Sequence, residues 1–110
     1  MATFDEFLKI DIRVGTIVQA APFPEAKKPA IKLEIDFGPE LGMKRSSAQL
    51  TMHYSPEALV GRQVVAVVNF PVRRIATFDS EVLVLGAMPT ASEVVLLQVE
   101  RRVENGTRIG

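Results

Sequence analysis

Ser55-Pro56-Glu57-Ala58-Leu59-Val60-Gly61 lies between two groups of strand-like segments and has the start and stop signals of a helix. Ser55 can cap the N-terminus, and Pro56 suits the first helical position because the amide hydrogen that it lacks would have no partner there. Gly61 can adopt the left-handed backbone conformation that ends many helices. The sequence therefore predicts a short helix at this point in the chain.

Three predicted strands precede this helix. The clearest is Ala30 to Phe37, where apolar residues alternate with charged ones, as in a strand with one buried face. Ile12 to Ala21 is predicted as the first strand, and Gly15 within it indicates a bulge or a bend. The turn region from Gly38 to Gly42 predicts that a third strand, Met43 to Met52, returns antiparallel. This third strand is unusually polar, so one of its faces should be solvated or should bind a ligand.

Two or three strands follow the helix: Val64 to Val68, Val82 to Leu85 and Val94 to Val99, with a loop carrying Arg73 and Arg74 after the first. Many short strands with Gly and Pro turns indicate a sandwich or a barrel. A helix between the third and fourth of five strands is typical of the OB-fold, a five-stranded Greek-key barrel. We therefore predict an all-β OB-fold with short helices and extended termini, as a single domain over residues 1–110.

The N-terminus carries a second helix signal. Thr3 and Glu6 match the capping box, in which each residue satisfies a backbone amide of the other. This motif predicts a short helix through Phe7 and Leu8. At the other end, residues 103–109 are predicted to form a turn-rich tail.

The last three strands are apolar on both faces, although a small barrel covers only its inward side. The clearest case is Ser80-Glu81-Val82-Leu83-Val84-Leu85-Gly86, where four apolar residues follow a polar pair. Burial stabilises a fold by roughly 25 cal/mol per Å² of apolar surface, so several side chains left in water would forgo several kcal/mol of stability. We expect a homodimer to bury these outer faces. The alternative is that the terminal segments of the same chain cover them.

The composition narrows the classes of partner and compartment. The 110 residues contain no cysteine and no apolar run near the ~20 residues that span a bilayer. Residues 1–6 lack the features of a signal peptide, so we expect a cytoplasmic protein without membrane insertion. A net charge of zero argues against nucleic-acid binding by bulk charge alone, yet eight basic and four acidic residues lie between Lys27 and Arg74.

No pattern in the sequence indicates catalysis. His53 is the one histidine, and a zinc site usually needs three or four ligands. There is no Gly-x-Ser-x-Gly elbow for a nucleophilic serine and no phosphate-binding glycine loop. We therefore expect a protein that is not an enzyme and that needs no cofactor or metal.

Several sequence blocks together resemble a known family. The blocks are Asp11-Ile12-Arg13-Val14-Gly15-Thr16-Ile17, residues 23–33, Lys44-Arg45-Ser46-Ser47-Ala48-Gln49-Leu50, residues 54–61, Val67-Val68-Asn69-Phe70-Pro71 and Ser80-Glu81. On these blocks the chain is similar to the OB-fold tRNA-binding domains, found free-standing and fused to some aminoacyl-tRNA synthetases, and within them to the CsaA branch of small bacterial export-related chaperones.

The resemblance implies a homodimer that binds structured tRNA in the wider family. In the CsaA branch it implies binding of unfolded preproteins or peptides, with a link to the Sec export machinery. Typical tRNA-binding members have Ser-Glu-Gly-Met where this chain has Ser80-Glu81-Val82-Leu83, and Asn-Leu-Lys-Pro where it has Asn69-Phe70-Pro71. The losses of a glycine and of a lysine weaken the tRNA hypothesis, and the gain of apolar surface favours peptide binding.

The first hypothesis is an ATP-independent chaperone with a peptide-binding groove near the dimer interface. Apolar side chains in loops would form the groove, and polar ones would satisfy the peptide backbone. The predicted peptide-binding residues are Phe23, Asn69, Phe70, Arg73, Ile75, Phe78, Ser80 and Glu81. The four apolar ones could instead simply close the end of the barrel.

The alternative hypothesis is tRNA binding. OB-folds bind nucleic acids along the face of strands 2 and 3 and the adjoining loops. The predicted tRNA-binding residues are Lys27, Lys28, Lys32, Lys44, Arg45, Arg73 and Arg74.

Overall fold

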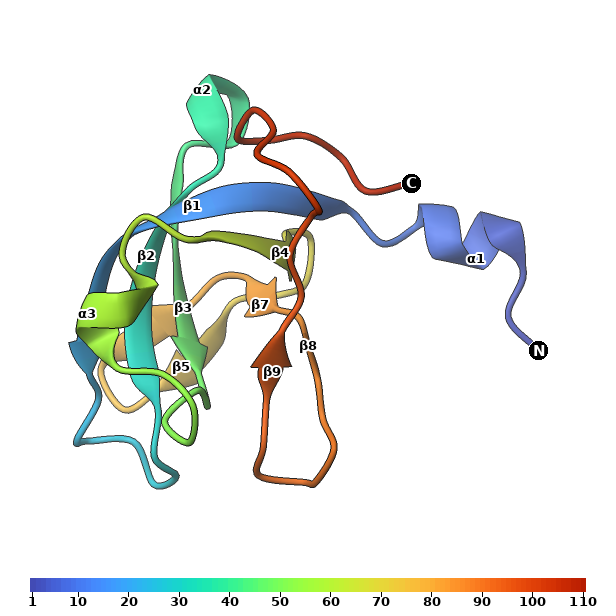
Figure 1. The fold of residues 1–110 in the computed structure, drawn as a ribbon. Helices are drawn as coiled ribbons and strands as arrows, with labels where there is room; N and C mark the ends of the chain where they lie inside the picture. Colours follow the sequence, from blue (N-terminus) through green and yellow to red (C-terminus); the bar gives the residue numbers. More distant parts are fainter.

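The structure, a computed structural model, describes all of residues 1–110. Five antiparallel strands form a nearly closed barrel in the order β3-β2-β1-β4-β7, with helix α3 between β3 and β4 in the chain (Figure 1). This arrangement confirms the predicted OB-fold. The elements of the barrel are β1 (Ile12–Pro22), β2 (Ile31–Asp36), β3 (Met43–Ala48), α3 (Pro56–Leu59), β4 (Gln63–Val67) and β7 (Leu83–Val84).

Helix α3 forms as its signals predict. The Ser55 side chain accepts a hydrogen bond from the Ala58 amide, and Pro56 is the first helical residue. Gly61 follows with a φ of +91°, a conformation in which a Cβ atom would be strained. Leu59 is fully buried, so the helix contributes a side chain to the barrel core.

The barrel interior is built from alternating residues of the strands. In β2, Ile31, Leu33 and Ile35 are buried while the residues between them are half-buried, as the alternation predicts. Phe37 follows on the same face and is 1% exposed. Of the bulge or bend expected at Gly15, the bulge is absent, because Gly15 pairs regularly with Val64 in β4.

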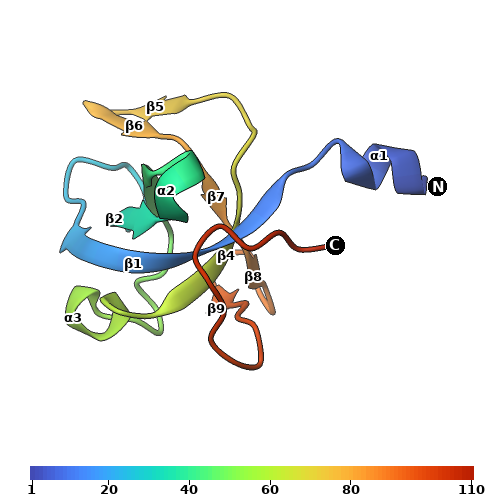
Figure 2. The same ribbon diagram turned by 90° about the horizontal axis from the view of Figure 1, so that it is seen from above.

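Two hairpins and a short helix form where the sequence predicts loops, a turn or a single strand. The expected loop around Arg73 and Arg74 is a hairpin of β5 (Arg73–Ile75) and β6 (Phe78–Ser80), which lies outside the barrel sheet (Figure 2). The second hairpin pairs β8 (Gly86–Ala87) with β9 (Val95–Leu96), and α2 (Gly38–Leu41) occupies the predicted turn.

Several strands are shorter than their sequence pattern predicts. The third strand ends at Ala48 rather than Met52, and the segment Val82 to Leu85 contains only the two-residue strand β7. Leu50 is nevertheless buried in the core, which explains why apolar residues continue past the end of β3. Apolar composition therefore marked burial at Leu50, but not regular strand pairing.

The two termini behave differently. Helix α1 (Phe4–Leu8) has the predicted capping box, has no buried residue and projects away from the barrel (Figure 1). The C-terminal tail instead runs beside the first half of β1. The Val14 amide donates to the Thr107 carbonyl at 2.9 Å, and the Gly106 amide donates to the Val14 carbonyl at 2.7 Å.

The expectation that three strands expose an apolar outer face is only partly correct. All five residues of β4 are buried within the single chain, so its second face needs no partner copy. The exposed apolar side chains of this region are instead Leu83, Val95 and Leu97. No helix of the chain combines the length and the apolar character that crossing a membrane would require.

Candidate ligand-binding grooves

Three grooves surround the β5–β6 hairpin. The first, here called the basic groove, has a volume of about 490 Å³ and lies between this hairpin, the end of β3 and the loop that joins β1 to β2. In OB-folds, the ligand face is flanked by the loop between the first and second barrel strands and by the loop between the fourth and fifth, which are β4 and β7 in this chain. The polar residues that line the basic groove include Lys27, Lys28, Ser47, Gln49, Arg73 and Arg74.

The basic groove has an excess of positive charge that its own residues do not neutralise. Lys27, Lys28 and Arg73 form no ion pair in the structure, and Glu25 is the one carboxylate among the lining residues. Arg74 differs, because its Nη1 lies 2.7 Å from Oδ1 of Asp79. The groove therefore presents three free cations to an anionic ligand.

The second groove, here called the apolar groove, lies beside the base of the same hairpin and has a volume of about 220 Å³. Phe70 and Leu83 are 43% and 49% exposed there. Arg73 and Ile75 line both this groove and the basic one, because strand β5 is the wall between them. The other lining residues are Ser47, Pro71, Ser80, Glu81 and Val82.

The third groove, here called the strand groove, covers the outer face of β1 and β2 and has a volume of about 630 Å³. Phe78 reaches it from β6, and its ring lies 5.4 Å from the ring of Phe23. Two cations also contact this ring, with Lys32 Nζ at 6.0 Å and Arg45 Cζ at 5.3 Å from its centroid. These contacts hold the tip of the hairpin against the barrel.

Ser80 and Glu81 close the barrel with their side chains. Ser80 Oγ accepts a hydrogen bond from the Ser47 amide at 3.0 Å, and Glu81 Oε1 accepts one from the Arg45 amide at 3.0 Å. Both amides belong to β3, the edge strand of the sheet. The polar pair thus satisfies backbone groups of β3 that no neighbouring strand reaches, and the sequence alone did not indicate this role.

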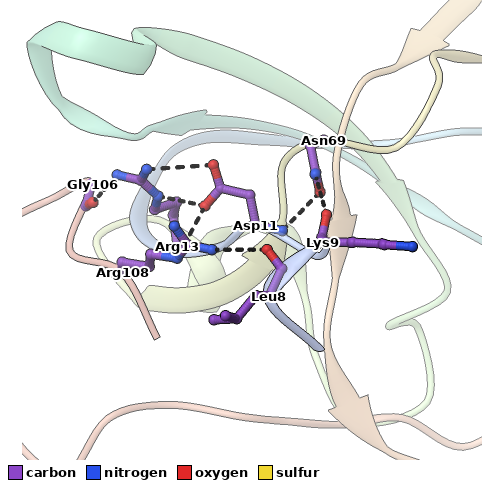
Figure 3. A network of polar contacts seen from close by, with 7 residues as sticks. All are labelled: Leu8, Lys9, Asp11, Arg13, Asn69, Gly106 and Arg108. Atoms are coloured by element: carbon purple, nitrogen blue, oxygen red, sulfur yellow. Dashed lines mark hydrogen bonds and ion pairs between the residues drawn. The ribbon is translucent and has the colours of Figure 1, made fainter. Parts of the chain in front are cut away.

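Asn69 has a similar structural role at the segment between α1 and β1 (Figure 3). Its Oδ1 accepts from the Asp11 amide at 2.8 Å, and its Nδ2 donates to the Lys9 carbonyl at 2.8 Å. Next to it, Arg13 donates to Asp11 at 2.6 Å and to the Gly106 carbonyl at 2.9 Å. The hydrogen bond to the Asp11 carboxylate raises the pKa of Arg13. Asn69 therefore holds the segment after α1, and both polar atoms of its side-chain amide already have a hydrogen-bond partner.

The structure brings together only part of each predicted site. Of the peptide-binding set, Phe70, Arg73, Ile75, Ser80 and Glu81 line the apolar groove. Phe23 is only 4% exposed, and its contacts with Phe78 and Lys32 make it part of the packing under the hairpin. Asn69 and Phe78 lie outside the apolar groove.

The predicted tRNA-binding set also divides. Lys27, Lys28, Arg73 and Arg74 line the basic groove, whereas Lys32 and Arg45 line the strand groove. Lys44 belongs with neither group, because it alternates with Arg45 along β3 and lies on the face of the buried Ser46.

The structure contains no cluster of three His, Cys, Asp or Glu side chains that could hold a metal ion. His53 Nε2 lies 2.6 Å from a carboxylate oxygen of Glu93, which joins the turn before α3 to the β8–β9 loop. The neighbouring Tyr54 hydroxyl accepts a hydrogen bond from the Leu96 amide at 3.0 Å. These contacts anchor the second hairpin to the barrel.

Comparison with known proteins identifies relatives over the whole length of the chain. The family model described as "Putative tRNA binding domain" matches residues 12–108. The crystal structure of chaperone CsaA from Bacillus anthracis str. Ames is 60% identical with a TM-score of 0.95, and covers 100% of this chain and 99% of its own. CsaA chaperone protein from Picrophilus torridus is 49% identical with a TM-score of 0.92, with complete coverage of both chains.

The curated relatives are larger proteins. The methionine–tRNA ligase of Methanococcoides burtonii is 37% identical over 109 residues, which are 99% of this chain but 16% of the ligase. Ligases from Porphyromonas gingivalis match at 34% and 33% identity over 15% of their length. The chain thus spans about one sixth of the length of these relatives.

Proposed function

The chain belongs to the tRNA-binding domain family as a CsaA-like member, and from that premise we propose that it is an ATP-independent chaperone for unfolded polypeptides. The apolar groove is the observation that carries this proposal. Its exposed Phe70 and Leu83 offer apolar surface beside a cation, and exposed apolar patches are typical of interaction sites. The 60% identity to a chaperone along the whole chain supports the same function.

The shape of the apolar groove favours a polymer over a small molecule. Its 220 Å³ lies below the ~300–1,000 Å³ of typical small-molecule pockets, so a single apolar side chain of a client suits it better. Strand β5 beside it pairs only with β6, which leaves the backbone of its other edge without a partner strand. An extended client segment could add to this edge while its side chains enter the groove.

The tRNA-binding hypothesis remains as a second candidate because the basic groove favours it. Lys27, Lys28 and Arg73 are free cations in one groove, and the matched family and the ligase relatives are associated with tRNA by name. Three to four phosphate contacts predict that log affinity falls with log salt at a slope of about −3. The two ligands would use opposite sides of strand β5.

We place the chaperone function in the cytoplasm, with preproteins as clients that are then passed to the Sec export machinery. We also propose that residues 1–110 fold as one domain and that this domain assembles as a homodimer. The CsaA-like family membership supports these finer proposals.

One titration with two ligands tests the proposed function. The protein is titrated with an unfolded client polypeptide and with bulk tRNA, each at low and at moderate salt. The double variant Phe70→Ser, Leu83→Ser should weaken polypeptide binding about tenfold, because about 25 cal/mol per Å² of apolar burial is lost, and should spare tRNA. The double variant Lys27→Ala, Lys28→Ala should weaken tRNA binding about tenfold and make its salt slope shallower by about two.

Matched controls separate these effects from general ones. Met43→Ser removes an equally exposed apolar side chain outside the apolar groove, and Lys9→Ala with Lys44→Ala removes two lysines outside the basic groove. If the wild type binds no unfolded polypeptide and does not suppress its aggregation, the chaperone proposal is wrong. If tRNA binding at low salt is absent, or does not depend on salt, the second candidate is wrong.

A further inference from the structure

One carboxylate in the β5–β6 hairpin contacts two arginines at the same time. Asp79 lies directly opposite Arg74 in the hairpin register, and its Oδ1 accepts a hydrogen bond from Arg74 Nη1 at 2.7 Å. Its Oδ2 lies 3.9 Å from Arg45 Nη2 on β3. Arg74 lines the basic groove and Arg45 lines the strand groove, so Asp79 sits between two cation-bearing surfaces.

Arg74 and Arg45 each have a carboxylate nearby, unlike the three free cations of the basic groove. Lys27, Lys28 and Arg73 form no ion pair, whereas Arg74 is paired with Asp79. Arg45 is approached by Asp79 and also by Glu81, whose Oε1 lies 3.7 Å from Arg45 Nε. The hairpin thus holds the Asp79 carboxylate at the place where a phosphate group of a ligand would contact Arg74 and Arg45.

We propose that Asp79 is a specificity-determining residue that limits the affinity of this surface for polyanions. The proposal rests on the second candidate function, tRNA binding through the basic groove. An exposed ion pair is weak, so a phosphate group can compete for Arg74. The carboxylate displaced from Arg74 then stays close to the phosphate and repels it. Asp79 therefore lowers polyanion affinity while it leaves the free cations Lys27, Lys28 and Arg73 unaffected.

The hairpin does not depend on this ion pair for its position. The backbone pairs Arg73 with Ser80 and Ile75 with Phe78 on either side of it, and the Phe78 ring packs on Phe23. The Asp79 side chain is about one-third exposed, so its neutral isostere should be tolerated. A change in ligand affinity can therefore be measured without loss of the fold.

The first experiment compares Asp79→Asn with the wild type in tRNA titrations over a range of salt concentrations. We expect about three- to tenfold tighter binding at low salt, and a salt slope steeper by about one for each phosphate contact that a released arginine adds. Asp5→Asn on the exposed helix α1 is the control, because it changes the net charge equally but lies far along the chain from the hairpin. Thermal unfolding of each variant checks that the fold is intact.

The second experiment places Arg74→Gln in both backgrounds. In the wild type this change leaves the Asp79 carboxylate without Arg74 and should weaken tRNA binding. In the Asp79→Asn background it should remove most of the gained affinity, so that the double variant binds about as tightly as the wild type. A purely structural role of Asp79 would not make the gained affinity depend on Arg74.

The outcomes separate this inference from the proposed function. If the wild type binds tRNA and Asp79→Asn behaves like Asp5→Asn, the inference is overturned and the second candidate function stands. If only Asp79→Asn binds, tRNA binding by the wild type is excluded while the restraining role of Asp79 stands. If neither protein binds tRNA at low salt, both are overturned.

Discussion

Gly15 occupies a place in β1 where the barrel has no room for a side chain. A Cβ atom at this position would lie 2.7 Å from Cγ2 of Ile35 and 2.7 Å from the ring of Phe37. Contacts this short do not occur without movement of the neighbours, and both neighbours are buried core residues. The glycine is needed for close packing, and the bulge of β1 lies further along, between Ile17 and Gln19.

Gly15→Ala should therefore destabilise the protein. Overpacking of a dense core costs about 1–3 kcal/mol, which corresponds to a lower melting temperature of roughly 4–12 °C for a domain of this size. Thermal unfolding followed by circular dichroism measures the shift. Gly110→Ala is the control, because nothing lies within 4 Å of the added atom, and an equal melting temperature for both variants would contradict the packing argument.

Single polar side chains also replace missing backbone pairs. Ser80 and Glu81 accept hydrogen bonds from the backbone of β3, and Ser46 Oγ donates to the Val82 carbonyl at 3.0 Å. Asn69 does the same for the segment between α1 and β1. Residues that resemble a family ligand site can thus be required for the fold, and their substitution would not report on binding alone.

At the scale of elements, the β5–β6 hairpin shapes both the basic and the apolar grooves. It is attached at its base through Ser80 and Glu81 and at its tip through Phe78. Its turn contains Ala76 with a φ of +52°, the one non-glycine residue in the left-handed region. The position of this single element therefore decides the width of both grooves.

Phe78→Ala should loosen the tip of this hairpin without unfolding the barrel. The change removes the contacts with Phe23, Lys32 and Arg45, so amide hydrogen exchange in residues 73–80 should become faster while exchange in β1 and β4 stays slow. Polypeptide and tRNA affinity should both fall, because strand β5 is a wall of both the apolar and the basic groove. Hydrogen exchange measured by mass spectrometry tests this, and uniform acceleration across the chain would contradict it.

At the scale of the whole molecule, exposed apolar side chains lie on helix α1 and around β9. Phe4 and Phe7 of α1 stack with their ring centroids 6.4 Å apart and are 71% and 37% exposed. Val95 and Leu97 at and just after β9 are also exposed. Because helix α1 projects from the barrel without a packing partner (Figure 2), a second copy of the chain is the occupant that we expect for this surface.

The protein should therefore sediment as a dimer at micromolar concentration, and Phe4→Ser with Phe7→Ser should shift it toward the monomer by removing apolar surface from the interface. Analytical ultracentrifugation measures the mass directly. Met52→Ser, which changes another exposed apolar side chain, serves as the control. A wild type that is monomeric at tens of micromolar would show that α1 has no such partner.

The predictability of each feature depends on how local its cause is. The caps of α1 and α3 and the alternation in β2 involve neighbours a few residues apart, and all three are as predicted. The β5–β6 hairpin was missed because Arg73 to Ser80 contains no glycine turn and no regular alternation. The lysines of the β1–β2 loop and the arginines of the hairpin predicted the basic groove in part. Lys44 and Arg45 were predicted for the same site, but they lie on opposite faces of β3 and neither lines the basic groove.

The sequence by itself determined the helix caps, the buried face of β2, the order of the main elements and hence the OB-fold. These follow from local hydrogen bonding and from the period of apolar residues, which act within one element. Only the tertiary structure decided that β4 is covered within the chain, that Ser80 and Glu81 close the barrel, and that Asp79 neutralises Arg74 beside three free cations. The first two depend on contacts between segments that are not neighbours along the chain, and the last depends on a hairpin register that the sequence did not reveal.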